Sequence, residues 1–528
     1  MYKQIIKAVP VLALILMMMS CEEFLQEEPK NQISTNQYFN KPEHARSAVN
    51  ALYGMGAPSR YNDGDDWQLD MMLGGYLSGL FVNERTERPG PYEANRLTLN
   101  DVNLDAYMHE WWSEGYDAVS QANNAIRYIP QIEGLSESET NRLLAEARFF
   151  RAFNYFFLVR NYGDVPLITE PYESAENLYV ERTPASQIYQ QIVTDLEWAL
   201  NNGGLASVPF HMNGNRITTG IVQTALADAY LQQAGYPVEG GETSYANAAT
   251  YAREVIQSGE YALIEHGDLD DTLANSAYNV MRTSNQEREY IYSYECHPQH
   301  RSNWLYHSSI PKYAQPAESV TRDVWIAYRP KKEYTRVYND EMDLRIQNKQ
   351  IWHNKITYNG EEYGFQGNWA PYIWYDEQAL FETDRSGKNV RIYRYAEVLL
   401  IAAEAIARTE GVTNEAVSYL ADVRNRAYWQ TDRNQIESEL QGLSEEEFVQ
   451  EVWKERLREL PLQFKIWPDI QRTRMYPVTD ADNPGEVTFE NVVGHDNTFG
   501  ENFEEHHLLY PLPKRAKDRN PELTGNGY

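Results

Sequence analysis

Long amphipathic helices that follow one another in pairs are the feature that most constrains how this chain can fold. Residues 107–129 and 138–163 carry apolar side chains at three- and four-residue spacing, the pattern of a helix with one buried face. Alanines within 225–235 and 400–411 allow neighbouring helices to lie close together. The expected fold is mostly α, a tetratricopeptide-like scaffold of helical pairs without a strict repeat of about 34 residues. Further segments with this pattern are 186–203, 216–235, 244–259, 391–411 and 414–427.

The middle of the chain has a different character. Residues 261–385 are richer in Tyr, Trp, Pro, Asn and Gly and contain short alternating runs such as EYIYSY at 289–294. This composition predicts a loop-rich, irregular subdomain inserted between two helical parts, residues 21–260 and 386–528. Loops on a rigid scaffold are where binding residues usually lie, so we expect ligand contacts to come from such segments.

The N-terminus carries an apolar run that stops at a cysteine. The uncharged stretch 8–20 is shorter than the roughly 20 residues that a membrane-spanning helix needs. Lys3 and Lys7 precede it, so residues 1–20 are predicted to be a signal peptide. The sequence around Ser20-Cys21 resembles a bacterial lipobox, whose cysteine becomes the lipid-carrying N-terminus. The mature protein is then anchored by Cys21 and does not span the membrane; the alternative is an ordinary secretory cleavage site near Cys21.

The net charge and the cysteine content limit which binding partners and which disulfides are expected. The formal net charge of −30 should repel nucleic acid and other polyanions, so neutral or cationic partners are favoured, although the charge can also serve solubility alone. If lipid is attached to Cys21, Cys296 has no partner for a disulfide within the chain. The 39 Tyr and 12 Trp supply flat apolar faces with a polar group, as stacking surfaces for sugar rings do, although many will lie in the core.

Several motifs together resemble the SusD/RagB family of Bacteroidetes surface lipoproteins. They occur in the order of that family: EEFLQEEPKNQISTNQYF (22–39), AEARFFRAFNYFFLVRNYGDVPLI (145–168), RYAEVLLIAAEA (394–405) and YPLPKRAKDRNPELTGNGY (510–528). In the second motif, Gly163 suits the left-handed position after a helix, and Pro166 prevents the helix from continuing. The segment 455–472 departs from the family pattern because it keeps Trp467 and Asp469 but lacks a glycine, which raises the question of how its turn forms.

The resemblance implies a SusD-like, tetratricopeptide-like scaffold that carries a loop-rich binding face. Members of this family bind extracellular glycans, or peptides in some cases, and act as a lid on a SusC-like TonB-dependent barrel. The acidic residues after Cys21 resemble the signal that directs such lipoproteins to the extracellular face of the outer membrane. The resemblance implies binding without catalysis. The expected function is therefore capture of an oligosaccharide for a partner transporter, and the alternative ligand is a peptide.

Candidate ligand residues lie in the loops. A glycan site combines an aromatic ring for the C–H face of a sugar with a few polar groups for its hydroxyls. Segments 62–70, 83–94 and 300–307 offer this mixture, although a half-buried tryptophan often only packs. The candidates are Asp66, Trp67, Arg85, Arg301, Asn303, Trp304 and Tyr306.

Metal and enzyme sites find little support in the sequence. CHPQH (296–300) has too few ligands for a structural zinc site, so no metal is expected there. The acidic runs 63–66 and 268–271 are weak candidates for calcium, because neither fits an EF-hand loop. Nucleophile-elbow, zinc-protease and phosphate-loop motifs are absent. A glycosidase needs only two carboxylates, so a surface glycoside hydrolase remains an alternative, as does a tetratricopeptide-like interaction module.

Overall fold

The computed structural model describes residues 38–62, 69–86, 88–172, 178–270 and 272–528, and its fold is mostly α-helical, as predicted. The N-terminal part begins with three short helices and two long ones. Asn100 and Ser136 begin the long helices by accepting hydrogen bonds from free backbone N–H groups of the first turn. Gly163 ends the second long helix with a φ of 73°, a region that favours glycine. These helices are α3 (Pro42–Leu52), α4 (Leu69–Leu77), α5 (Pro89–Asn95), α6 (Asp101–Tyr128) and α7 (Glu137–Tyr162).

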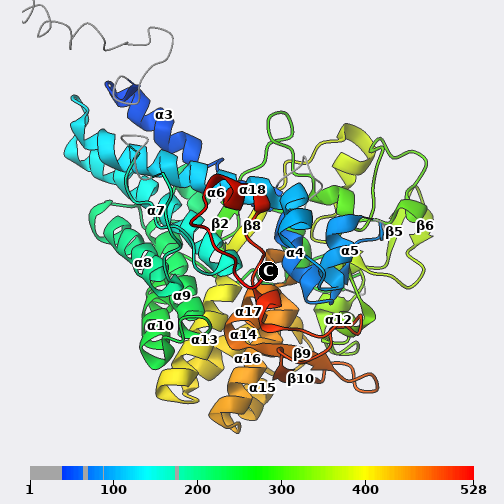
Figure 1. The fold of residues 1–528 in the computed structure, drawn as a ribbon. Coiled ribbons are helices and arrows are strands. Elements are labelled where there is room, and N and C mark those ends of the chain that lie inside the picture. Colours follow the sequence, from blue (N-terminus) through cyan, green and yellow to red (C-terminus); the bar gives the residue numbers. More distant parts are fainter. Residues whose placement is uncertain (1–37, 63–68, 87, 173–177, 271) are drawn as a thin grey trace, which may run out of the picture.

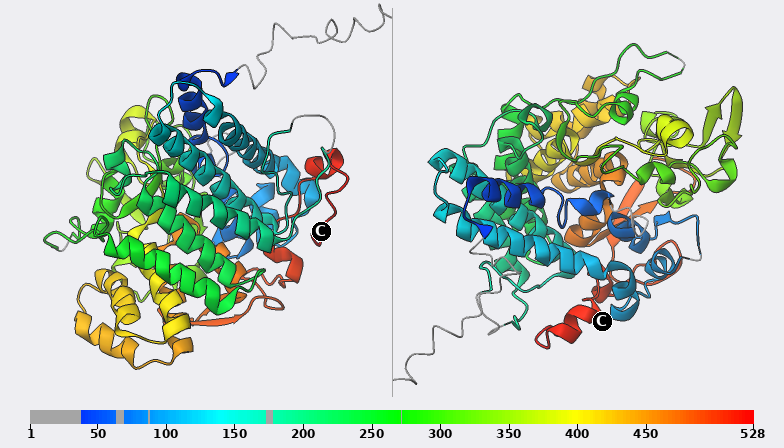
Figure 2. Two further views of the ribbon diagram at one scale, coloured as in Figure 1. Left: turned by 90° about the vertical axis from the view of Figure 1, so that its left-hand side faces the viewer. Right: turned by 90° about the horizontal axis from the view of Figure 1, so that it is seen from above.

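The helices form a continuous array in which each packs against the next. The succession runs from α6 through α7, α8, α9 and α10 to α13 and α14, and α16 returns onto α13 (Figure 1). The additional views show the green helices directly beside the yellow ones (Figure 2). Alanines at the α9, α10 and α13 contacts are fully or almost fully buried, which permits close approach. The later helices are α8 (Ala185–Asn202), α9 (Thr219–Ala234), α10 (Gly241–Gln257), α13 (Tyr395–Glu410), α14 (Asn414–Ala427), α15 (Arg433–Gln441) and α16 (Glu445–Glu459).

The chain between α10 and α13 leaves the array and returns to it. This segment holds α11 (Ala277–Thr283), α12 (Lys332–Thr335) and short strands, and its β5–β6 hairpin lies at the right of Figure 1. Among the described residues the strands form antiparallel pairs only: β1 with β3, β2 with β8, β4 with β7, β5 with β6, and β9 with β10. Their bounds are Phe81–Val82 (β1), Tyr290–Tyr294 (β2), Arg329–Pro330 (β3), Trp352–His353 (β4), Lys355–Tyr358 (β5), Glu361–Gly364 (β6), Ala370–Pro371 (β7), Val390–Arg394 (β8), Met475–Thr479 (β9) and Val487–Asn491 (β10).

The alternating run at 289–294 becomes β2, and all five residues of that strand are buried. Tyr292 shows why, because its ring meets the edges of Phe149 and Phe153 from α7 and of Phe210. Tyr292 therefore packs β2 against the helical array, while β8 pairs with the edge of the strand.

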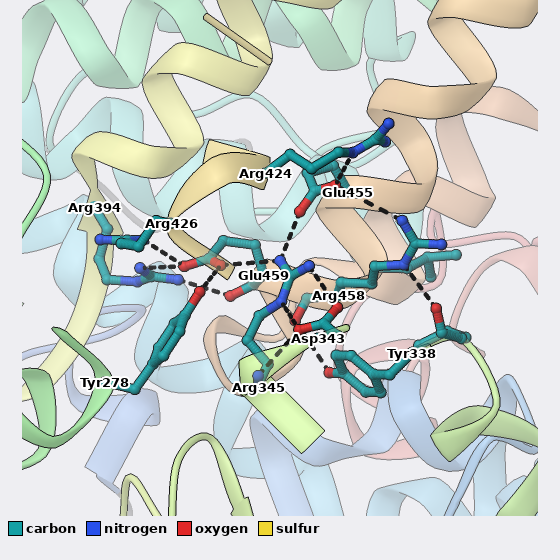
Figure 3. Close-up of polar contacts among 12 residues, drawn as sticks. Tyr278, Tyr338, Asp343, Arg345, Arg394, Arg424, Arg426, Glu455, Arg458 and Glu459 are labelled. Carbon is teal, nitrogen blue, oxygen red and sulfur yellow. Dashed lines mark hydrogen bonds and ion pairs between the residues drawn. The ribbon is translucent and has the colours of Figure 1, made fainter. Parts of the chain in front are cut away.

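A buried network of ion pairs fastens the inserted segment to the helices (Figure 3). Arg345 is fully buried, and its guanidinium lies 2.8 Å from Asp343, 2.7 Å from Glu455 and 3.1 Å from Glu459. Glu459 in turn accepts from Arg394 at 2.9 Å and from Arg426 on α14 at 2.8 Å. Four parts of the fold, namely the 343–345 turn, β8, α14 and α16, therefore contribute charges to one network.

The turn that lacks the family glycine forms with Phe464 in the left-handed conformation, at φ 59° and ψ 34°. A non-glycine residue loses about 1–2 kcal/mol there. The Phe464 ring is buried and packs against Tyr61, Tyr328 and Trp374, and burial of a phenylalanine contributes about 1.5–3 kcal/mol. Ring burial thus offsets the backbone strain. The chain then enters α17 (Ile466–Thr473), and the last helix is α18 (Lys514–Arg519).

A smaller apolar cluster in the inserted segment surrounds a neutral histidine. His353 is fully buried beside the rings of Phe365, Tyr372 and Tyr375, and its Nε2 lies 2.5 Å from the carbonyl oxygen of Ser309. Burial is the main reason why the pKa of His353 is lowered from 6.5 to about 3.

This histidine should make the protein sensitive to acid. Between pH 6.5 and 3 the unfolded chain binds a proton at His353 that the folded chain does not, so stability falls as the pH falls. The His353→Gln variant keeps a donor for the Ser309 carbonyl. Between pH 7 and pH 5 we expect its free energy of unfolding to fall by about 2 kcal/mol less than that of the wild type. Denaturant unfolding at both pH values measures this difference. Identical pH dependence of the two proteins would contradict the assignment.

Among the described residues, no helix combines the length and the apolar character needed to cross a bilayer. The predicted signal peptide and Cys21 lie outside the described residues.

Candidate functional site

Two loops that are far apart in the sequence are joined by Asn62. Its side-chain Nδ2 donates to the carbonyl of Ser302 at 3.0 Å, and its Oδ1 accepts from the backbone N–H of Trp304 at 3.1 Å. Asn62 is buried and directly precedes residues 63–68, which lie outside the described residues together with the candidates Asp66 and Trp67. The loop that carries Trp304 is therefore fastened to Asn62, the last described residue before that gap.

A third loop reaches the same region through Arg85. Its guanidinium forms an ion pair with Asp323 and lies 4.0 Å from the centre of the Trp325 ring. The neighbouring Glu84 holds this loop in place, because its backbone N–H donates to Ile326 at 2.9 Å and its carboxylate accepts from the Ile326 N–H at 2.8 Å. The Arg85 side chain is therefore held between a tryptophan face and a carboxylate and remains 27% exposed.

His307 connects these two groups. Its backbone carbonyl accepts from the N–H of Trp325 at 3.0 Å, and its Nδ1 lies 2.6 Å from the carbonyl of Asp323. The His307 ring lies 5.4 Å from the ring of Trp304, which is half-buried. Burial lowers the pKa of His307, so the imidazole is neutral near pH 7. Arg85, Trp304 and Asp323 are brought together here, and we call these three partly exposed side chains the Trp304 face; the buried Asn62 and His307 hold its loops in place.

The other predicted residues have different surroundings. Asn303 is 5% exposed and bonds to backbone through both side-chain atoms, donating to Lys388 at 2.7 Å and accepting from Leu305 at 2.7 Å. Tyr306 is 1% exposed and donates to Asp384 at 3.0 Å. Both side chains hold the loop and are left out of the Trp304 face.

Arg301 is exposed and lies on a separate small pocket. Its guanidinium is 5.2 Å from the centre of the Tyr294 ring, and it lines a hollow of about 250 Å³ together with Asn215 and Glu295. Burial raises the pKa of Glu295, and Asn215 and Asn389 each donate to its carboxylate at 2.6 Å. The structure thus separates Arg301 from the other predicted residues of its loop.

A large hollow among the described residues was not predicted from the sequence. It has a volume of about 1230 Å³ and lies between α12, the β5–β6 hairpin and the loop 365–369. Its lining includes Trp369, several side-chain amides and the basic residues of Arg329-Pro-Lys-Lys332. We call it the basic groove. Two sequence features could have indicated this groove, namely the basic run in an acidic chain and the Asn368-Trp369 pair. Nothing in the sequence showed that they lie beside each other.

Within the described part of the chain, no group of three or more His, Cys, Asp or Glu side chains is arranged to hold a metal ion. The weak calcium candidates at 63–66 and 268–271 both include residues outside that part, so this expectation stays a prediction. Burial, together with Glu295, raises the pKa of the Cys296 thiol to about 12, which keeps it protonated and poorly reactive near neutral pH.

A helical scaffold whose loops bring an arginine, a carboxylate and a tryptophan to one face belongs to the class of ligand-binding proteins with a loop-built site. A family model described as "SusD family" matches residues 211–528, and a second one, described as "Starch-binding associating with outer membrane", matches residues 23–202. The chain therefore belongs to the SusD family, as its motifs predicted.

Known proteins are similar to this chain over nearly its whole length. SusD-like protein P2 of Formosa agariphila is 25% identical over 536 residues, which is 98% of each chain. A SusD superfamily protein from Parabacteroides distasonis superposes with a TM-score of 0.79 at 27% identity, covering 92% of this chain and 99% of that one. Surface glycan-binding protein A from Bacteroides thetaiotaomicron, in complex with laminarihexaose, has a TM-score of 0.71 at 18% identity and covers 93% and 100% of the two chains. The last similarity concerns the fold alone.

Proposed function

We propose that this protein captures oligosaccharides at the cell surface without cleaving them and delivers them to a SusC-like TonB-dependent barrel. In this proposal residues 1–20 are a lipoprotein signal peptide, Cys21 carries the lipid on the extracellular face of the outer membrane, and 21–528 is one SusD-like domain. Membership of the SusD family supports this function, as does the complex of surface glycan-binding protein A with laminarihexaose. The observation that carries it is the Trp304 face.

The chemistry of the Trp304 face suits a sugar. The partly exposed Trp304 ring can stack on the C–H side of a pyranose, while the ion pair of Arg85 and Asp323 offers charge-assisted donors and acceptors to neighbouring hydroxyls. Stacking on Trp325 restrains Arg85 before the ligand arrives, so less side-chain entropy is lost on binding. The acidic surface leaves uncharged oligosaccharides or cationic peptides as ligands for this face.

Binding of oligosaccharides by residues 22–528 tests the proposal. We expect saturable binding to one glycan class in affinity gels and calorimetry, with no new reducing ends formed. Trp304→Ala should weaken it about tenfold or more, as truncation of an aromatic anchor commonly does. The matched control is Trp198→Ala on α8, which removes a tryptophan that is half-buried like Trp304 but lies in the helical array, with Arg148 4.6 Å from the centre of its ring.

Other results would separate the alternatives. Release of reducing ends would identify a glycoside hydrolase and overturn the proposal. A blank glycan screen with binding of basic peptides would instead identify a peptide-capturing lid. Equal affinity of the Trp304→Ala and Trp198→Ala variants would remove the Trp304 face from the site.

A further inference from the structure

We propose that the basic groove is a second saccharide site, which takes a sugar unit carrying a carboxylate or a sulfate. The inference rests on the proposed glycan-binding function and adds the chemical class of the ligand. Four basic side chains line the groove, Arg329, Lys331, Lys332 and Lys355, against two acidic ones, Glu333 and Asp340. The local sign of charge is therefore opposite to that of the chain, whose net charge is −30.

Three of these four cations have no described carboxylate within ion-pair distance, although Glu333 acts on Lys331 and Glu84 on Arg329 from further away. In the described residues, no ion pair involves Arg329, Lys331 or Lys332, whereas Lys355 pairs with Glu362 at 2.7 Å. Acidic residues outnumber basic ones 77 to 47 in the sequence, so carboxylates are plentiful elsewhere. Cations left unpaired along one hollow in such a chain indicate a site for an external anion.

Arg329 is held in position for this purpose. One terminal nitrogen donates to Oδ1 of Asn368 at 2.5 Å, while its Nε is buried without a hydrogen-bond partner. Lys331 is oriented by two bonds of 2.8 Å to Thr498 and lies 4.0 Å from the centre of the Phe499 ring. Lys332 is exposed. The buried Nε is out of reach of a ligand, but a bound carboxylate or sulfate would accept from the other terminal nitrogen of Arg329 and from the exposed ammonium of Lys332.

The groove also holds groups that a bare anion does not need. Trp369 is half-buried in its lining, and Asn348, Asn354 and Asn368 also line the groove. The loop that carries Trp369 is fastened, because Tyr313 donates to the Phe365 carbonyl at 2.6 Å and accepts from Asn368 at 3.0 Å. An aromatic face with amides is suited to a sugar ring and its hydroxyls. The cations would then bind the charged substituent of that ring.

The groove lies close to the Trp304 face along one ladder. Val82 of β1 pairs with Arg329 of β3, and two residues further on Glu84 bonds to Ile326, directly beside Arg85. We propose that one oligosaccharide places an uncharged part at the Trp304 face and a charged unit in the groove.

The test compares acidic and neutral oligosaccharides of similar length by calorimetry at low salt. The probes are oligogalacturonate, a sulfated galactan oligosaccharide, a neutral gluco-oligosaccharide and inorganic sulfate. We expect an acidic oligosaccharide to bind at least tenfold more tightly than the neutral one, and its affinity to fall as salt is raised from 50 to about 500 mM. Arg329→Gln should weaken acidic binding about tenfold and leave neutral binding unchanged.

The matched control is Lys355→Gln in the same groove, which should change acidic binding less than about twofold because Glu362 already compensates that charge. Trp369→Ala should weaken the acidic oligosaccharide but not inorganic sulfate. Circular dichroism and thermal unfolding confirm that each variant is folded.

The possible failures differ in meaning. One such result is that the neutral glycan binds through Trp304 while the acidic glycan binds no more tightly and its affinity is unchanged by Arg329→Gln. That result would overturn this inference and leave the proposed function standing. Sulfate that binds as tightly as the sulfated oligosaccharide would make the groove a general anion site and also overturn it. If no oligosaccharide binds at all, the proposed function and this inference fall together.

Discussion

Replacing Arg345 by methionine should lower the free energy of unfolding by about 3–5 kcal/mol, the typical effect of breaking a buried ion pair from one side. The guanidinium of Arg345 is fully buried and neutralises Asp343, Glu455 and Glu459, which are 0–1% exposed. Burial alone would raise the pKa of Glu455, yet Arg345 and Arg424 lower it to about 2. Without Arg345, these carboxylates stay buried with too little positive charge.

Equilibrium denaturation measures this loss, with the exposed pair of Lys355 and Glu362 as its control. These two side chains are 43% and 58% exposed, so Lys355→Gln should change stability by less than about 1 kcal/mol. Equal stability of the Arg345→Met and Lys355→Gln variants would show that the buried network does not fasten the inserted segment to α14 and α16.

The second large effect is expected at Lys465, where α17 begins. Its ammonium lies 2.8 Å from Glu397 on α13 and 3.1 Å from Asp228 on α9, and all three residues are buried. Lys465→Met should reduce stability by about 3–5 kcal/mol, because it leaves two neighbouring carboxylates with little compensation. Among the residues that the structure describes, Arg456 at 3.9 Å from Glu397 is then the one remaining ion-pair partner of either carboxylate.

This loss should depend on pH. Burial raises the pKa of Glu397, and Lys465 opposes that effect, so removing the lysine raises the pKa further. The folded variant then takes up a proton that the unfolded chain lacks, and its stability falls as the pH rises above about 5. Unfolding at pH 5 and pH 8 should therefore show the smaller loss at pH 5.

A double variant provides the control for Lys465. Adding Glu397→Gln to Lys465→Met removes one uncompensated carboxylate, so it should recover part of the lost stability and reduce the pH dependence. Strictly additive losses would mean that Lys465 and Glu397 do not interact in the folded protein.

The helical scaffold could be predicted because each of its elements has a local cause. Apolar residues at helical spacing mark α6 and α7, and the glycine at 163 marks the end of α7. The missing glycine near residue 464 could not be interpreted in this way. Its turn depends on burial of the Phe464 ring among residues that are distant in the sequence, such as Tyr61 and Tyr328.

The site was predictable only in part. Sequence patterns pointed to the loops of Arg85 and Trp304, and the structure connects these loops through His307 and Asp323. The same patterns did not distinguish Trp304 from Asn303 and Tyr306, because burial depends on the path of neighbouring segments. The basic groove was missed for a similar reason, since Arg329 and Trp369 meet only after the inserted segment folds back on itself.

The sequence by itself determined the family, the helical scaffold and the loops from which a ligand site is built, because these follow from spacing, turn residues and motif order. Only the tertiary structure decided which loop residues reach a common surface and which charges are paired. Contacts between distant segments depend on packing, and neither the buried charges of Arg345 and Lys465 nor the unpaired ones of Arg329 and Lys332 carry a local signature.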